Sequence, residues 1–117
     1  MDISKKLVET VISEDIYGTI LIEDSIVKYT TLESTDYFGF DTFSNNQINI
    51  YEFAFKCKEW VISQGIAIES GKYKIDDDEY ICRYYLPGRC SIWQNYFGLT
   101  ELEAIFKARE RLLNIKG

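Results

Sequence analysis

The stretch Asn49–Gly65 constrains the fold of this chain more than any other. Its apolar side chains recur at the three-and-four spacing that places them on one stripe of a helix, the pattern of a helix that covers a sheet. They are Ile50, Phe53, Ala54, Cys57 and Val61. We expect Asn49 to cap this helix, with Glu52 completing a capping box, and Gly65 to end it in the left-handed conformation. The stretch therefore predicts one amphipathic helix packed on a sheet.

The chain before this helix predicts a shorter helix, a β-hairpin and a long connection. Ser4–Ser13 carries a helical apolar stripe behind a Ser4 cap. Tyr17–Ile22 and Ile26–Thr31 are rich in β-branched and aromatic residues around a polar turn, which predicts a hairpin. In Leu32–Gln47 isolated rings alternate with Ser, Thr, Asp and Asn, which indicates a loop anchored by its rings or an irregular strand. A loop of this length in a compact domain is more often functional than inert.

The chain after the central helix predicts three strands, over Ile66–Ile75, Tyr80–Leu86 and Cys90–Phe97. Pro87-Gly88 is a strong turn signal. A turn with two central residues would pair Arg83 with Ile92 and point Cys82 and Cys90 to opposite faces. A three-residue loop would put the two cysteines on one face.

A last helix is expected behind a Thr100 cap, with Glu103 completing its capping box. Its buried stripe consists of Leu102, Ile105, Phe106, Leu112 and Leu113. Lys107, Arg109 and Arg111 are expected on a solvated face near the C-terminal end, where cations complement the helix dipole.

These elements predict the α+β class. A helix and β-hairpin in residues 1–48 are appended to, or extend the sheet of, an α-β-β-β-α unit in residues 49–117, and the whole is expected to form a single domain. Both helices of that unit are expected on one face of an antiparallel sheet, because an antiparallel sheet can leave its other face in water.

The charge and composition exclude several classes of function. With 19 acidic and 13 basic residues the net charge is −6, which repels phosphate backbones and favours basic partners, so we do not expect nucleic acid as a ligand. The absence of histidine removes the commonest general base and zinc ligand. Three cysteines without a CxxC pair indicate reduced core thiols, and no metal or cofactor is expected. No spacing suggests a catalytic pair, so we expect no enzyme.

Targeting signals are also lacking in the sequence. No apolar run approaches the length of about 20 residues that a membrane span requires, and the N-terminus lacks the apolar core of a signal peptide. We therefore expect a cytoplasmic protein without membrane contact.

Two groups of residues are candidates for binding a partner. The acidic run Asp76, Asp77, Asp78 and Glu79 would present concentrated negative charge to a groove lined with Arg or Lys, although a cation site or a solvated turn are alternatives. In Leu32–Phe43, Asp36, Tyr37, Phe38 and Asp41 combine carboxylates with rings, which suits a basic protein surface. The alternative is that these rings pack on the hairpin.

A third group lies around the Pro87-Gly88 turn. Aromatic and Arg side chains on an open sheet face can stack bases or form cation–π contacts. They are Arg83, Tyr84, Tyr85, Arg89 and Trp93, and ordinary cross-strand packing is the alternative interpretation.

The order of elements over residues 49–116 resembles the double-stranded-RNA-binding fold. The segment LTELEAIFKARER, Leu99–Arg111, lacks the lysine cluster which that family places at the start of its last helix. The segments FAFKCKEWVISQG and TELEAIFKARERLL are similar to small uncharacterised proteins of bacteriophages and prophages. That resemblance implies an acidic accessory protein that binds a host component, for example as an inhibitor of a defence nuclease.

The leading hypothesis is a non-catalytic acidic protein that binds a host protein and blocks a basic surface. The alternative is a nucleic-acid-binding module of the double-stranded-RNA-binding type. A third hypothesis is self-association into a homo-oligomer through an exposed sheet edge or the aromatic loop.

Overall fold

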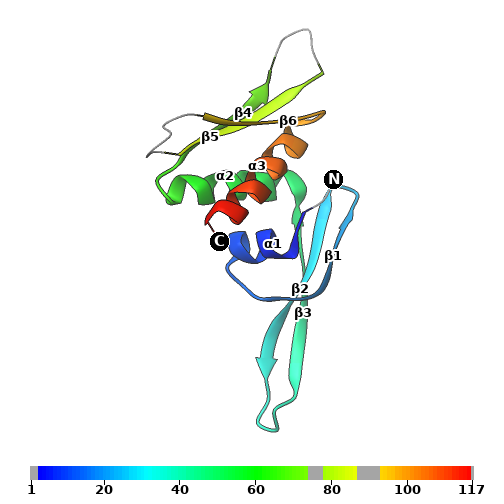
Figure 1. The fold of residues 1–117 in the computed structure, drawn as a ribbon. Coiled ribbons are helices and arrows are strands. Elements are labelled where there is room, and N and C mark those ends of the chain that lie inside the picture. Colours follow the sequence, from blue (N-terminus) through cyan, green and yellow to red (C-terminus); the bar gives the residue numbers. More distant parts are fainter. Residues whose placement is uncertain (1–2, 74–77, 87–92, 117) are drawn as a thin grey trace. The chain divides into compact units, whose positions relative to one another are not determined.

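The computed structural model describes residues 3–73, 78–86 and 93–116 and confirms the α+β class (Figure 1). The elements follow the order α1 (Lys5–Ile12), β1 (Ile16–Glu23), β2 (Ile26–Thr35), β3 (Asp41–Asn49), α2 (Ile50–Ser63), β4 (Ala67–Lys72), β5 (Tyr80–Tyr85), β6 (Trp93–Gly98) and α3 (Glu101–Lys116).

The contacts within the chain divide it into two compact units, an N-terminal unit over Ser4–Phe53 and a C-terminal unit from Ala54 onward. Each contains one antiparallel sheet of three strands, in the order β1-β2-β3 and β4-β5-β6. The predicted hairpin thus pairs with β3 in a sheet of its own and does not extend the other sheet. The single domain over residues 1–117 stays a prediction.

In the N-terminal unit, α1 packs against β1 and covers one face of the sheet. The Ser4 cap is confirmed, because Ser4 Oγ accepts a hydrogen bond from Leu7 N at 3.1 Å. Asp24 and Ser25 both have positive φ, 49° and 63°, which matches the right-handed twist of a tight hairpin. The apolar side chains between helix and sheet are buried; they are Leu7, Val8, Ile16 and Val27.

The segment after the first hairpin is an irregular strand pair and not a loop. β2 continues to Thr35, and β3 pairs with it from Thr35↔Asp41 to Ile26↔Asn49, with one register shift between Leu32 and Ser34. Cross-strand hydrogen bonds between polar side chains replace apolar packing, for example Ser34 Oγ to Thr42 Oγ1 at 2.8 Å. The polar composition that indicated a loop therefore stabilises strands.

The Asn49 cap and the left-handed Gly65 at the two ends of α2 are confirmed, whereas the capping-box bond of the Glu52 side chain stays a prediction. Asn49 Oδ1 accepts hydrogen bonds from Tyr51 N at 2.8 Å and from Glu52 N at 3.4 Å. At the other end Gly65 has φ of 79°, its N–H donates to Ile62 O, and Ile66 N–H donates to Val61 O. These two bonds form the Schellman motif, which satisfies the last carbonyls of the helix.

The register of the second sheet corrects the predicted turn. Tyr85 pairs with Trp93 and Arg83 pairs with Asn95, so residues 86–92 connect β5 to β6. The two-residue turn is therefore wrong, because it would have paired Arg83 with Ile92, whereas the three-residue loop falls on residues outside the described ranges. Cys90 and Arg89 lie outside the described residues.

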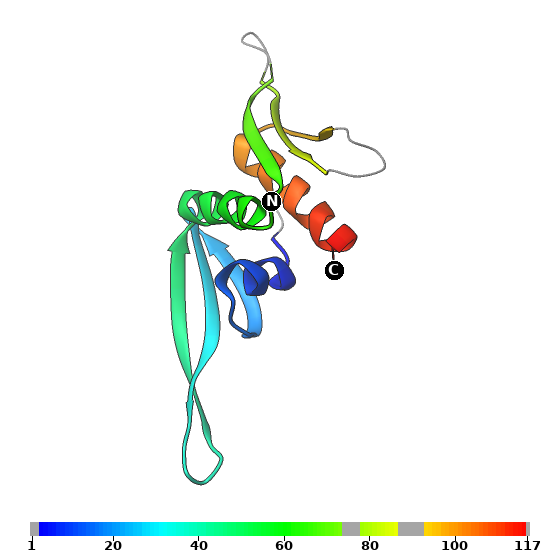
Figure 2. The ribbon, with the colours of Figure 1, turned by 90° about the vertical axis from the view of Figure 1, so that its left-hand side faces the viewer.

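In the C-terminal unit, α2 and α3 lie on the same side of the sheet (Figures 1 and 2). A chain of hydrogen bonds joins them to β4, because Lys58 Nζ donates to Ser70 Oγ at 3.0 Å and Ser70 Oγ donates to Glu101 Oε1 at 2.7 Å. Cys57 and Cys82 are free thiols in the core beneath. Burial raises the pKa of each thiol to about 12, so both stay protonated at neutral pH.

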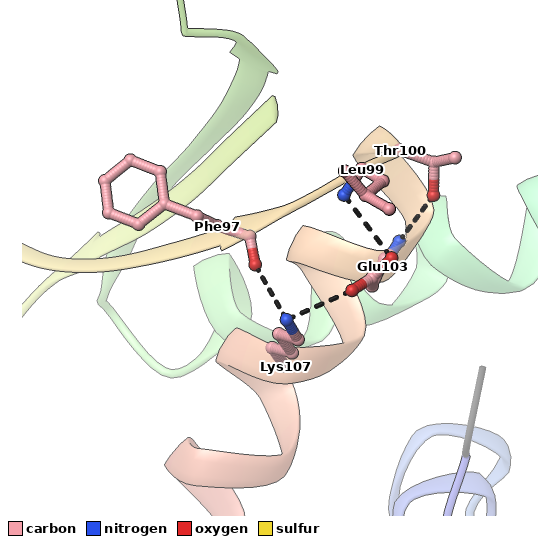
Figure 3. Close-up of polar contacts among 5 residues, drawn as sticks. All are labelled: Phe97, Leu99, Thr100, Glu103 and Lys107. Atoms are coloured by element: carbon pink, nitrogen blue, oxygen red, sulfur yellow. Dashed lines mark hydrogen bonds and ion pairs between the residues drawn. The ribbon is translucent and has the colours of Figure 1, made fainter. Parts of the chain in front are cut away.

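Helix α3 begins directly against the end of β6. Thr100 Oγ1 accepts a hydrogen bond from Glu103 N at 3.1 Å, and Glu103 Oε2 accepts one from Leu99 N at 3.3 Å (Figure 3). The capping box therefore reaches one residue further back than predicted. Lys107 Nζ joins this cluster through Glu103 Oε1 at 3.0 Å and the Phe97 carbonyl oxygen at 3.0 Å.

Arg109 contradicts the prediction of a solvated cationic face. Its side chain is fully buried, and its guanidinium carbon lies 4.3 Å from the centre of the Trp60 ring. Its three side-chain nitrogens lack a hydrogen-bond partner among the residues that the structure describes. Burial lowers the pKa of Arg109, because desolvation disfavours the charged form. The described surroundings of this buried charge are the Trp60 ring and the Cys57 thiol, and interaction with the thiol partly offsets the lowering of the pKa.

We predict that Gly98→Ala lowers the free energy of unfolding by about 1–3 kcal/mol, because an added methyl group forces apart a packed contact. A Cβ at Gly98 would lie 2.8 Å from Ala104 N and 2.9 Å from Glu103 Cβ. Gly71→Ala is the matched control, since a Cβ there meets nothing within 4 Å. Urea unfolding followed by circular dichroism measures both, and equal midpoints for the two variants would contradict the prediction.

We predict that Arg109→Met keeps the free energy of unfolding or raises it by about 1–2 kcal/mol, because Met fills the site without a buried charge. Arg109→Ala leaves a cavity and should lower it by about 2–4 kcal/mol. Thermal and urea unfolding of the two variants give the comparison. A Met variant as unstable as the Ala variant would show that the guanidinium stabilises the core.

Candidate protein-binding surface

The β2–β3 hairpin ends in an aromatic tip, residues 36–40. Tyr37, Phe38 and Phe40 are 96%, 80% and 70% exposed. Figures 1 and 2 show that the hairpin extends beyond the part of its sheet that α1 covers. The alternative that these rings pack on the hairpin is therefore wrong for the tip.

Asp36 fixes the conformation of the aromatic tip. Its Oδ1 accepts hydrogen bonds from Phe38 N at 2.9 Å and from Phe40 N at 2.8 Å. Its backbone N–H donates to Phe40 O at 2.9 Å, and Gly39 N–H donates back to Asp36 O. Gly39 has φ of 86°, which a residue with a side chain rarely adopts. The tip is a turn held by an Asp side chain, a local arrangement that Asp favours.

The strands next to the tip add a second layer of polar bonds. Thr35 Oγ1 donates to Asp41 Oδ1 at 2.7 Å. Ser34 and Thr42 bond through their hydroxyl groups, and Thr42 Oγ1 also donates to Ser34 O. The backbone that carries the rings is thus ordered before any partner arrives, which lowers the entropy lost on binding.

The face of this sheet opposite α1 carries further exposed apolar side chains. Tyr17 and Phe43 meet edge to face with ring centres 5.2 Å apart. Leu21 is 52% exposed and Leu32 is 40% exposed. The apolar surface of the N-terminal unit therefore continues from the aromatic tip onto the open face of the strands.

A hollow of about 460 Å³ lies on the N-terminal sheet, lined by Thr19, Leu21, Lys28, Tyr29, Thr30, Asn45, Asn46 and Gln47. It lies where β1 bulges, since the register shifts between Tyr17 and Leu21 and Gly18 has φ of 77°. Thr30 Oγ1 donates to Asn45 Oδ1 within it. Lys28 pairs with Glu23 at 3.2 Å, so the hollow carries little net charge.

The charge around the aromatic tip has a single sign. Glu33, Asp36 and Asp41 are the charged residues of Leu32–Phe43, and the sequence holds no Lys or Arg from Tyr29 to Phe55. Since Glu33 and the tip are exposed, their field acts on an approaching partner. This surface combines apolar rings with carboxylates.

The other predicted binding group is only partly described. Asp76 and Asp77 lie outside the described residues, whereas Asp78 and Glu79 precede β5, and Glu79 O accepts a hydrogen bond from Tyr73 N. The acidic run belongs to the C-terminal unit and the aromatic tip to the N-terminal unit. Within the described ranges no cluster of three or more acidic or cysteine side chains could hold a metal ion.

Sequence reasoning identified the carboxylates and rings of the tip region but missed the open face of the sheet. A further signal for the tip is the sequence Asp36-Tyr-Phe-Gly39, in which Asp and Gly predict a tight turn that leaves the intervening rings without a core. Tyr17 and Phe43 required the strand register, which composition did not supply.

No family model, no curated protein and no solved structure matches this chain. In the part of the chain that the structure covers, no helix is long and apolar enough to cross a membrane.

We predict that Asp36→Ala raises the hydrogen-exchange rates of the Phe38 and Phe40 amides about tenfold, because each amide loses its acceptor. Asp36→Asn is the matched control, since it keeps an Oδ1 acceptor without the charge, and its rates should stay within about twofold of the parent. NMR-detected exchange measures both. Unchanged rates in the Ala variant would show that Asp36 does not hold the tip.

Proposed function

We propose that this protein is a non-catalytic binding module that docks its aromatic tip into an apolar groove of a partner protein whose rim is rich in Lys and Arg. The observation that carries the proposal is the exposure of Tyr37, Phe38 and Phe40 on a tip held by Asp36. Exposed rings of this kind leave apolar area in water that a partner would bury.

The energetics favour a groove over a flat surface. Aromatic anchors contribute most when a pocket desolvates them completely, and Tyr is among the commonest of these anchors. Three rings on one turn enter such a pocket together, and the ordered backbone limits the entropy that binding costs.

The negative charge beside the aromatic tip determines which partner proteins it can bind. Glu33, Asp36 and Asp41 lie beside the rings without a basic residue among them, so a basic rim would be complementary and an acidic one would repel. Proteins that handle nucleic acids carry basic grooves of this type. Occupation of such a groove would inhibit a host protein such as a defence nuclease, with Asp76–Glu79 as a second acidic contact.

The alternative of a nucleic-acid-binding module gains no support at the start of α3. The residues there are Glu101 and Glu103, and both carboxylates are engaged, with Ser70 and with Leu99 and Lys107. Negative charge at this helix end would face phosphates unfavourably.

We predict that the triple variant Tyr37→Ser, Phe38→Ser, Phe40→Ser loses at least about 100-fold in affinity for the partner, because several anchor residues are removed together. The matched control is Tyr51→Ser with Phe55→Ser, which removes rings that are 63% and 60% exposed on α2. Its affinity should stay within about threefold of the parent. All five substituted rings are at least 60% exposed, so both variants should fold, which circular dichroism checks.

The partner is first isolated by photocrosslinking, with a benzophenone amino acid in place of Phe38, from a lysate of the native cell. Its affinity for the parent, the triple variant and the control is then measured by calorimetry at low and moderate salt. Equal affinity of the triple variant and the control would overturn the proposal. An affinity that does not fall with salt would remove its electrostatic part.

A further inference from the structure

The two outer strands of the N-terminal sheet differ in the protection of their free edges. β1 and β3 are the outer strands, because the strand order is β1-β2-β3. β1 is interrupted by a register shift between Tyr17 and Leu21, where Gly18 has positive φ, and it packs against α1. A bulge and a covering helix are two of the devices that keep an outer strand from pairing with another chain.

β3 carries none of these devices. It is nine residues long, contains no Lys or Pro, and its register with β2 runs without a shift from Asn49 back to Phe43. Among the described helices and strands it packs on β2 alone. The outer strands of the C-terminal sheet, β4 and β6, are six residues each, and both pack against α3. In the described part of the chain, β3 is therefore the outer strand with the longest unprotected edge.

The register fixes which backbone groups of β3 point to this edge. Ile50 N–H donates to Ser25 O, which continues the pairing of β3 with β2 by one residue. In an antiparallel pair, bonded residues alternate with residues whose N–H and C=O point to the opposite side. Every second residue counted back from Ile50 therefore bonds to β2, and the residues between them direct their backbone groups to the free edge. These residues are exposed; they are Phe43, Asn45 and Gln47.

We propose that β3 pairs edge to edge with β3 of a second copy of this chain, forming a two-fold symmetric dimer with one continuous sheet. Strand addition of this kind satisfies the N–H and C=O groups of an open edge. In the antiparallel register centred on Asn45, that residue faces itself across the two-fold axis, and Phe43 faces Gln47 of the second copy. All edge-directed groups then meet each other, and about six backbone hydrogen bonds form.

The charges of β3 allow this register. Asp41 is the one charged residue of the strand, and it lies opposite Asn49 of the second copy. Asn49 caps α2, and the positive end of a helix dipole favours a carboxylate. Glu52, in the first turn of α2, lies beyond the paired segment. The two strands therefore bring no like charges directly opposite each other, which is the arrangement that destabilises cross-strand pairs.

The dimer is expected to be weak. Its binding energy comes from directional backbone bonds along one strand, so the buried area is at the small end of specific interfaces. The charge of −6 on each chain adds repulsion. The two aromatic tips lie at opposite ends of the joined strands, so the pairing does not depend on what the tips bind.

Sedimentation velocity tests the proposal over about 5 to about 500 µM, a range that covers a Kd of about 100 µM or tighter. The expected result is a mass that rises with concentration from the monomer value of 13.7 kDa toward twice that value. A monomer mass at every concentration would overturn the proposal.

Hydrogen exchange measured by NMR locates the interface. The amides of Phe43, Asn45 and Gln47 gain an acceptor in the dimer, so their exchange should slow at least about twofold between about 30 and about 500 µM. The amides of Ser44 and Asn46 already bond to β2 and serve as internal controls, whose rates should not change. Slowing of both sets, or of neither, would contradict pairing through this edge.

Variants at Asn45 test the register. Asn45→Lys and Asn45→Glu each place two like charges across the two-fold axis, so each should weaken the dimer at least about tenfold. An equimolar mixture of the two variants places opposite charges there and should dimerise at least about tenfold more tightly than either variant alone. Gln64→Lys, at an exposed residue after α2, makes the same charge change elsewhere and should leave the affinity within about twofold of the parent.

The outcomes separate this inference from the proposed function. A mixture that stays monomeric, or an Asn45→Lys variant that dimerises like the parent, would show that the β3 edges do not pair. Because residue 45 is exposed, both of its variants should fold, which circular dichroism checks. The triple variant of the aromatic tip should still dimerise, and loss of its dimer would count against β3 as the interface.

Discussion

The pairing of β2 with β3 is the constraint on which the N-terminal unit depends. The aromatic tip lies at one end of this strand pair, away from α1. At the other end β3 continues directly into α2. Asn49 ends the ladder opposite Ile26, and its side chain caps the next helix, while Ile50 N–H donates to Ser25 O at 2.8 Å. Strand and helix therefore meet without a connecting loop, and a change in strand register would displace both the tip and the helix cap.

The selectivity of the aromatic tip has a physical basis in its rings and its carboxylates. The aromatic tip presents rings beside carboxylates on a fixed turn, so it distinguishes partners by charge and by the presence of a groove.

Local signals in the sequence predicted much of the fold. Caps and turns depend on a few neighbouring residues, and Ser4, Asn49, Thr100 and Gly65 act as expected. The β2–β3 pairing could not be predicted in the same way, because Ser, Thr and Asn form strands here through bonds that exist only in the correct register. The β5–β6 register could not be derived from Pro87-Gly88 alone, because a turn signal does not fix which residues of the two strands pair, and Arg83 pairs with Asn95 and not with Ile92. The burial of Arg109 could have been predicted from the sequence, because Arg109 lies four residues after Ile105 and three before Leu112 on the buried stripe.

For the candidate site, Asp36, Tyr37, Phe38 and Asp41 were predicted from the composition of their segment. Their presentation on a protruding hairpin could be seen only in the structure.

The placement of Asp36 and Asp41 on either side of the exposed rings has a consequence for solubility. A short apolar segment at the end of a hairpin is the kind of sequence that assembles into intermolecular β-structure. Charged residues at both ends of such a segment oppose this assembly, because stacking identical chains would bring like charges into register. The same two carboxylates that shape the tip thus keep Tyr37, Phe38 and Phe40 available in a crowded solution.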